Sequence, residues 1–210
     1  SEPLGWNRLS VAPLWLRHRF IRLIHREMQY AQEGKEAHIV AKMNSLCDKE
    51  IIATLYEASR AGVKIELIIR GICCLKVGIP GISENISVRS IVGNFLEHSR
   101  IFYFHNGGAE EVYMGSADWM PRNLDKRVEI LFPVEDPNLK EAVKHILRVE
   151  LDDTVKARIL QADGHYERVD RRGKPYINSQ EVFCEEAAAA EKQEKETIGR
   201  IFIPMERPEE

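Results

Sequence analysis

Residues 38–70 are predicted to form a strand, a helix and a second strand, and this unit constrains the fold more than any other feature of the sequence. Residues 38–43 and 64–70 are rich in β-branched and apolar side chains, which is typical of buried strands. Between them, a capping box starts at Ser45 and apolar side chains recur at helical spacing over residues 51–58. A crossover of this length requires the two strands to run parallel in one sheet.

The patterns outside this unit complete a mixed sheet with helices on both of its faces, an α/β or α+β fold. Asn106-Gly107-Gly108 lies between two apolar runs and predicts a hairpin. The further helices are predicted at residues 15–33 and 137–151, and the further strands at residues 86–91, 101–105, 111–114 and 128–134.

A length of 210 residues fits one large domain, or one domain with appendages. We expect residues 15–160 to form that domain. Residues 1–14 lack periodicity and are expected to be a linker, at the edge of a domain that belongs to a longer chain. Residues 161–210 are polar, and we expect a C-terminal extension there that is partly helical or disordered.

Charge and cysteine content exclude several classes of protein. Lysine and arginine number 30 and aspartate and glutamate 33, a net charge of −3, whereas a general nucleic-acid binder is usually basic. No apolar run is long enough to cross a bilayer. The four cysteines include adjacent Cys73 and Cys74 but no Cys-x-x-Cys zinc motif. We therefore expect free thiols, a cytoplasmic protein, no metal ligands and no nucleic-acid partner.

The end of the second strand carries the first candidate for ligand binding. Arg70 lies where this strand passes into a glycine-containing loop. Ligands of open α/β sheets bind at the carboxyl ends of parallel strands, and the planar guanidinium suits phosphate. A surface arginine in a salt bridge is the alternative interpretation.

The predicted hairpin brings together a second group of candidates. His98 precedes one of its strands and Ser116 follows the other, so both are expected at the same end of the sheet, with Arg100 and Asp118 close by. A histidine, an arginine, a hydroxyl and a carboxylate can bind phosphate and move a proton. Taken singly, His98 could instead be structural or merely exposed.

Arg122, Asn123 and Arg127 follow the Gly115-Ser116 turn and are expected to extend a phosphate pocket, the alternative being a solvated loop. The sequence contains no P-loop, no dinucleotide-binding glycine motif and no His-Glu-x-x-His. A phosphate site must therefore come from side chains that converge in the fold.

His98-x-Arg100 followed by Gly115-Ser116-x-Asp118 resembles a degenerate half of the phospholipase D signature, with Arg100 in place of the family's lysine and Asp118 in place of its asparagine. Longer stretches resemble the C-terminal domain of bacterial polyphosphate kinase, and the resemblance covers roughly residues 10–175. These stretches are residues 39–46, 69–75, 95–100 and 116–125.

The resemblance implies an enzyme that moves the terminal phosphate of ATP reversibly onto polyphosphate through a phosphohistidine. It implies ATP, ADP and polyphosphate as ligands, and Mg²⁺ bound mainly by residues outside this chain. The phosphorylated histidine belongs to a preceding phospholipase D-like domain, so the isolated chain is expected to be inactive. A cytoplasmic homo-oligomer is expected, with peripheral membrane association as an alternative.

The family's ATP-contacting arginine and second active-site histidine map onto Arg70 and His98, at the spacing that the family motifs require. Arg127 matches an arginine thought to line the phosphate pocket. We therefore expect His98 to be catalytic, and Arg70, His98, Arg127 and Ser116 to bind ATP or phosphate. The expected supporting residues are Arg100, Asp118, Asn123, Lys42 and Asn44.

Two other functions stay open. A homodimeric phosphodiesterase of the phospholipase D type would bring two copies of His98 together. Arg100 argues against it, because arginine stays protonated and cannot donate a proton. A non-catalytic phosphate- or protein-binding domain would follow if the candidate side chains failed to converge.

Overall fold

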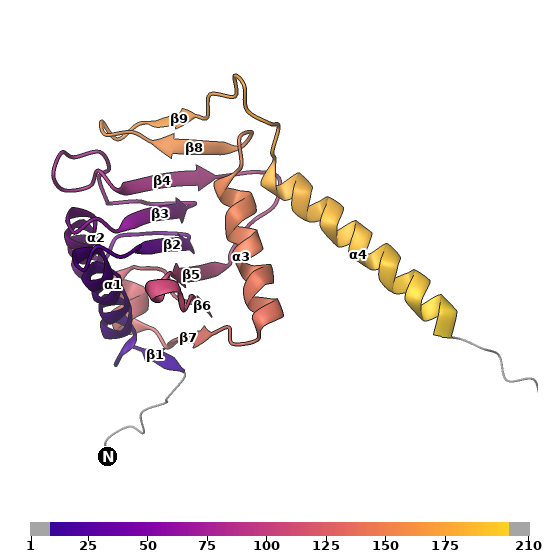
Figure 1. The fold of residues 1–210 in the computed structure, drawn as a ribbon, viewed down its shortest axis with the longest axis horizontal. Helices are drawn as coiled ribbons and strands as arrows, with labels where there is room; N and C mark the ends of the chain where they lie inside the picture. The colour runs from indigo at the N-terminus through magenta and orange to yellow at the C-terminus, as the bar shows by residue number, and fades with distance from the viewer. Residues whose placement is uncertain (1–8, 202–210) are drawn as a thin grey trace, which may run out of the picture.

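A single mixed β-sheet organises the part of the chain that the computed structural model describes, residues 9–201. In spatial order its strands are β1 (Ser10–Ala12), β7 (Glu129–Pro133), β6 (Glu111–Gly115), β5 (Arg100–Phe104), β2 (His38–Met43), β3 (Lys64–Ile69), β4 (Ile86–Ile91), β8 (Ala157–Leu160) and β9 (Tyr166–Arg168) (Figure 1).

The predicted strand–helix–strand unit is confirmed at the centre of this sheet. Strands β2 and β3 are parallel neighbours, and α2 (Lys49–Arg60) connects them. The helix begins at Asp48, whose carboxylate accepts a hydrogen bond from the amide of Ile51 at 3.0 Å, rather than through the predicted capping box at Ser45. Asp48 satisfies one of the first free amides of the helix, which is the role of an N-cap.

Helices cover both faces of the sheet, as predicted. Helices α1 (Leu16–Gln32) and α2 lie on one face, and α3 (Pro137–Leu151) lies on the other (Figure 1). The larger core lies under α1 and α2 and includes an aromatic cluster of Phe20, Phe102 and Trp119, with ring centroids 4.6–5.4 Å apart. Contacts of this kind add to the free energy gained from burying the rings.

The smaller core lies between the sheet and α3. Val40, Ile68 and Tyr103 face it from the strands, and Val143 and Leu147 face it from the helix. Helix α3 starts as its sequence predicts, because the Asp136 carboxylate caps it and a proline occupies its first turn. The α/β architecture predicted from the sequence is therefore confirmed.

Both ends of the described chain hold structure that the sequence analysis did not assign. Residues 10–12 were expected in a linker, yet they pair with β7, and residues 166–168 of the expected polar extension pair with β8. Three-residue strands are too short for a two-residue alternation to stand out. Helix α4 (Ser179–Ile201) starts before the predicted polar helix at residue 185 and leaves the body of the molecule (Figure 1). The expectations of a linker over residues 1–14 and of an extension over residues 161–210 also cover residues 1–8 and 202–210, which lie outside the described residues.

Among the helices of residues 9–201, none combines the length and the hydropathy needed to cross a bilayer.

Candidate functional site

The strand directions bring the candidate residues to one edge of the sheet, which we call the site edge. Parallel β2 and β3 both end there, and antiparallel β5 starts there, since Lys42 pairs with Ile101. Pairing of Arg100 with Gly115 places the end of β6 beside the start of β5. His98 and Ser116 therefore lie at the same end of the sheet, as the predicted hairpin requires.

Arg70 and His98 meet at the site edge. Nη2 of Arg70 lies 3.4 Å from Nδ1 of His98, and Nη1 donates a hydrogen bond to the carbonyl oxygen of Glu97 at 2.7 Å. His98 is exposed and Arg70 is half-buried. Within residues 9–201, Arg70 has no carboxylate at ion-pair distance, so its charge is available to an anion.

Arg100 and Asp118 form a buried ion pair instead. Nε of Arg100 donates to Oδ1 of Asp118 at 3.1 Å, and Nη1 donates to the carbonyl oxygen of His98 at 2.6 Å. The same carboxylate accepts from the backbone amide of Asn44 at 2.8 Å and from its side-chain amide at 3.3 Å. These three residues tie the end of β2 to the backbone that carries His98, which fits their predicted supporting role.

Ser116 and Asn123 are joined through a residue that the sequence analysis did not single out. The Ser116 hydroxyl donates to the carboxylate of Glu129 and accepts from the amide of Ile130 at 3.1 Å, while Asn123 Nδ2 donates to Glu129 Oε1 at 2.6 Å. Gly115 permits this close packing, because a Cβ there would lie 2.5 Å from the carbonyl oxygen of Ile130. The Ser116 hydroxyl thus already donates its proton to Glu129, so this proton is not free to form a hydrogen bond with phosphate.

Arg127 lies on the site edge but away from Arg70. It directly precedes Val128 and the start of β7, and its side chain is exposed. Four strand spacings separate β7 from β3, which is roughly 19 Å at the usual distance between strands. The backbone positions of the two arginines therefore lie well apart along one edge.

Lys42 is buried between two carboxylates. Its amine lies 2.5 Å from Glu97 Oε2 and also contacts Glu150 Oε1. Burial raises the pKa of Glu150 to about 8, helped by the Glu97 carboxylate and opposed by Lys42. Burial also acts to raise the pKa of Glu97, but hydrogen bonds with Glu150 and Lys42 outweigh it and lower that pKa to about 2. The Lys42 ammonium thus contacts the ionised carboxylate of Glu97 and the protonated carboxyl group of Glu150. Lys42 therefore holds the segment that carries His98 and does not bind a ligand.

Glu97 and Glu129 carry much of the site's polar structure, although the sequence analysis gave neither a role. Glu97 stands next to His98, and that position is a signal that could have marked it. Glu129 gives no comparable signal, because only the pairing of β6 with β7 brings it to Ser116.

Residues 9–201 contain no ready-made cluster of side chains for binding a metal ion. Among residues 9–201, no group of three or more histidine, cysteine, aspartate or glutamate side chains could hold one. The Mg²⁺ expected from the family resemblance stays a prediction about residues elsewhere.

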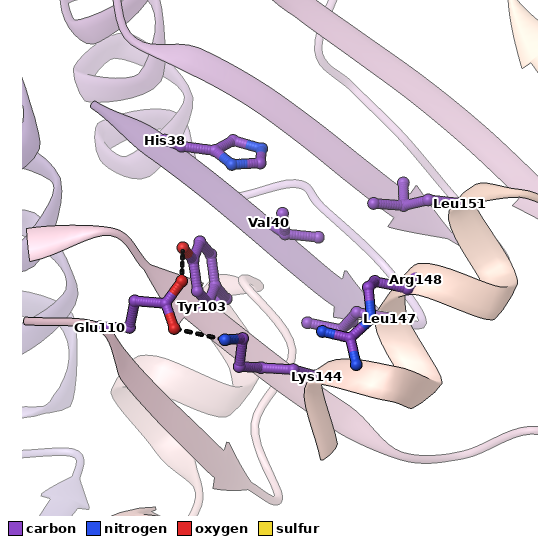
Figure 2. Close-up of a pocket in the computed structure, with 8 residues that line it drawn as sticks. All are labelled: His38, Val40, Tyr103, Glu110, Lys144, Leu147, Arg148 and Leu151. Carbon is purple, nitrogen blue, oxygen red and sulfur yellow. Dashed lines mark hydrogen bonds and ion pairs between the residues drawn. The ribbon is translucent and has the colours of Figure 1, made fainter. Parts of the chain in front are cut away.

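One cavity lies away from the candidate residues. Figure 2 shows a pocket of about 230 Å³ between the sheet and α3, in which Tyr103 donates to Glu110 at 2.7 Å and Glu110 pairs with Lys144. His38 and Tyr103 belong to the ends of β2 and β5 that lie opposite the site edge.

A second cavity, of about 460 Å³, borders the His98 segment. It is mostly apolar and lies between that segment, α3 and α4. Its lining residues include Phe95, Glu97, Ser99, Ile146, Gln180 and Phe183.

Comparisons with known proteins agree with this geometry. A sequence profile described as "Polyphosphate kinase C-terminal domain 2" matches residues 9–180. The chain is 52% identical to polyphosphate kinase 1 of Chlorobaculum tepidum, over 93% of this chain and 27% of that protein. It is 51% identical to the polyphosphate kinase of Pseudomonas aeruginosa, over 90% of this chain and 28% of that protein. The chain thus spans about a quarter of the length of the curated relatives it matches.

Solved structures give the same result. The crystal structure of polyphosphate kinase from Porphyromonas gingivalis matches with a TM-score of 0.87 and 40% identity, over 92% of this chain and 30% of that one. Nuc from Salmonella typhimurium, a phospholipase D family member, matches with a TM-score of 0.51 and 17% identity, over 77% of this chain and 97% of that one, and this likeness concerns the fold alone. The chain belongs to the polyphosphate kinase C-terminal domain family.

Proposed function

We propose that the chain supplies half of an active site to a longer polyphosphate kinase, which transfers the terminal phosphate of ATP reversibly to polyphosphate through a phosphohistidine. The observation that carries the proposal is the pairing of Arg70 with His98 at the site edge. A guanidinium that has no carboxylate partner among residues 9–201, beside an exposed imidazole, offers a fixed positive charge and a movable proton at one place.

Arg70 would hold a phosphate group of ATP. Phosphoryl transfer depends mainly on positioning and on neutralising the charge of the equatorial oxygens, which a guanidinium does at any working pH. Its Nη1 already donates to the Glu97 carbonyl, and this bond keeps the fork from rotating away.

His98 would act through its outer ring nitrogen. A neutral imidazole that accepts from Arg70 at Nδ1 carries its proton on Nε2. That N–H is then free to donate to a phosphate oxygen or to exchange a proton with the phosphorylated histidine, which lies in the preceding phospholipase D-like domain of the same chain.

Arg127, some distance along the site edge, would meet a different part of the ligand. With backbone positions roughly 19 Å apart, the two arginines suit successive phosphates of an extended polyphosphate chain better than a single phosphate group. Ser116 would contribute by fixing this edge through Glu129, and a bond to phosphate would require its hydroxyl proton to turn from Glu129 to a phosphate oxygen.

The partners in this proposal are ATP, ADP, polyphosphate and the preceding domain, in a cytoplasmic homo-oligomer that binds Mg²⁺ outside this chain. The relatives are about four times as long as the aligned region, which leaves room for such a domain. The homodimeric phosphodiesterase is less favoured, because Arg100 is committed to Asp118 and arginine does not release a proton.

Labelling with ATP tests the proposal. The chain alone and the longer protein are each incubated with γ-labelled ATP and Mg²⁺. The longer protein should acquire acid-labile label that chases into polyphosphate, and the chain alone should acquire none. Label on His98 of the isolated chain, at a rate similar to that of the longer protein, would contradict the proposal. His98-dependent hydrolysis of bis(p-nitrophenyl) phosphate by the chain alone would favour the phosphodiesterase.

A further inference from the structure

His98 lies on a segment without regular structure. Residues 92–99 connect β4 to β5 and form neither helix nor strand, so the ladder of the sheet does not hold their backbone. Such a segment keeps one conformation only if other groups satisfy its amides and carbonyls. The placement of His98 therefore depends on the contacts of its neighbours.

Gln180 of α4 supplies the contacts at Phe95. Its Oε1 accepts from the backbone amide of Phe95 at 3.0 Å, and its Nε2 donates to the carbonyl oxygen of the same residue at 2.8 Å. The side chain thus bonds both backbone groups of Phe95, as a neighbouring strand would. Gln180 is buried, with 6% of its surface exposed, so these bonds are sheltered from water.

The same amide also reaches Glu97, next to His98. Nε2 donates to Glu97 Oε1 at 2.8 Å, while the other oxygen of that carboxylate binds Lys42. Gly93 leaves space for Gln180, since a Cβ there would lie 2.2 Å from the amide oxygen. A single side chain thereby touches the segment at three of its residues.

The start of α4 is itself fixed to the segment that directly follows α3. The backbone amide and hydroxyl of Ser179 both donate to Asp153 Oδ2 at 2.8 Å. Asp153 is almost fully buried, and its other oxygen accepts from three consecutive amides, of Val155, Lys156 and Ala157. Gln180 is therefore held on a rigid support and can impose a position on the segment that it binds.

We propose that Gln180 is a positioning residue for His98: it holds residues 95–97 so that the imidazole faces Arg70. The inference rests on the proposed function and extends it, because it makes the start of α4, which lies far from His98 in the sequence, part of the active-site framework. The competing interpretation is that Gln180 only docks α4 and has no influence on the chemistry.

Kinetics of the longer protein separate the two interpretations. Gln180→Glu keeps the size of the side chain but replaces the donating amide by an oxygen that faces the Phe95 carbonyl and Glu97. Because a misplacement of about 1 Å can cost about 10²-fold in rate, we expect kcat to fall by about 10²-fold with KM for ATP within about twofold. In a His98→Gln background, Gln180→Glu should lower kcat by less than about a further threefold, because that background has no imidazole whose position could be disturbed. A full further loss in the double variant overturns the proposal.

Amide exchange tests the positioning without any turnover. In Gln180→Ala, the Phe95 amide loses its acceptor, and its exchange with solvent deuterium should accelerate at least about tenfold, with the strand amides of β5 unchanged. Unchanged exchange at Phe95 overturns the proposal. Glu185→Ala, an exposed position on the same helix, is the matched control and should alter neither exchange nor kcat.

The two readouts also separate this inference from the proposed function. Wild-type kcat for His98→Gln would end the proposed function, and faster exchange at Phe95 in Gln180→Ala would then still establish that Gln180 holds the His98 segment. Faster exchange together with an undiminished kcat in Gln180→Glu, while His98→Gln is impaired, would overturn the positioning role alone.

Discussion

Two arginines contact the His98 segment, and their surroundings give them different tasks. Arg100 pairs with the buried Asp118 and holds the His98 carbonyl, whereas Arg70 contacts the imidazole and has no carboxylate partner among residues 9–201. The first should matter for folding stability and the second for catalysis. Sequence position alone does not assign these tasks, because Arg70 directly follows one strand and Arg100 begins another.

Replacement of Arg100 should destabilise the fold. Arg100→Ala leaves the Asp118 carboxylate buried without its cation, which costs about 3 kcal/mol or more of unfolding free energy. Urea unfolding of the chain measures this loss. Arg60→Ala, at an exposed position on α2, is the control and should change the unfolding free energy by less than about 1 kcal/mol. Equal stabilities for the two variants would show that the Arg100–Asp118 pair contributes nothing.

Glu150 should make stability fall as pH rises. Its pKa of about 8 in the folded chain lies above the usual 4.5, so the folded state keeps a proton that the unfolded state has lost between those pH values. Unfolding free energy should therefore decrease from about pH 4.5 to 8, and Glu150→Gln, which is neutral throughout, should remove that slope. Glu97 acts in the opposite sense: because its folded pKa is about 2, its contribution is lost as pH falls from about 4.5 to 2.

Urea unfolding at a series of pH values measures both slopes. Glu57→Gln, an exposed substitution on α2, should leave the slope between about pH 4.5 and 8 unchanged. An unaltered slope in Glu150→Gln would mean that Glu150 is ionised in the folded chain.

The candidate site was predictable from the sequence where chain direction decides it. Arg70 follows a strand, and His98 and Ser116 flank a hairpin, so their common edge follows from strand pairing. The hydrogen-bond partners were not predictable. Gln180 is 83 residues from Glu97 in the sequence, and only the docking of α4 onto α3 brings the two together.

At the scale of elements, helix signals proved more reliable than short-strand signals. The apolar stripe of α1 and the proline-containing start of α3 predicted these helices closely. Strands β1, β8 and β9 escaped prediction, because three or four residues carry too little pattern and their assignment depends on the neighbours with which they pair. The start of α4 escaped for the same kind of reason, since its contacts with Asp153 are tertiary.

Truncation tests what α4 contributes. Removing residues from Glu185 onward should cost less than about 1 kcal/mol, because residues 185–194 are exposed and the ion pair between Glu186 and His145 lies at the surface. Removing residues from Ser179 onward also deletes two hydrogen bonds to the buried Asp153 carboxylate, which should cost about 3 kcal/mol or more. Thermal unfolding of the two shortened chains measures the difference, and similar losses would show that the start of α4 has no structural role.

At the scale of the whole molecule, the sheet acts as a frame that presents charged groups along one edge. The order of the strands places Arg70, His98 and Arg127 successively along that edge, while both cores lie behind it. Under the proposed function, this edge would face the other half of the active site. The family membership and the greater length of the relatives suit this arrangement.

A pH–rate series for phosphoryl transfer by the longer protein tests the central claim most directly. Wild type, Arg70→Ala, Arg70→Lys and His98→Gln are compared, with Arg60→Ala as the control. Arg70→Ala should lower kcat at every pH, and Arg70→Lys should recover part of the loss because it keeps the charge but not the planar fork. His98→Gln should lower kcat by about 10²–10⁴-fold and flatten one limb of the profile, because glutamine does not titrate. Wild-type rates for His98→Gln across the whole pH range would contradict the account.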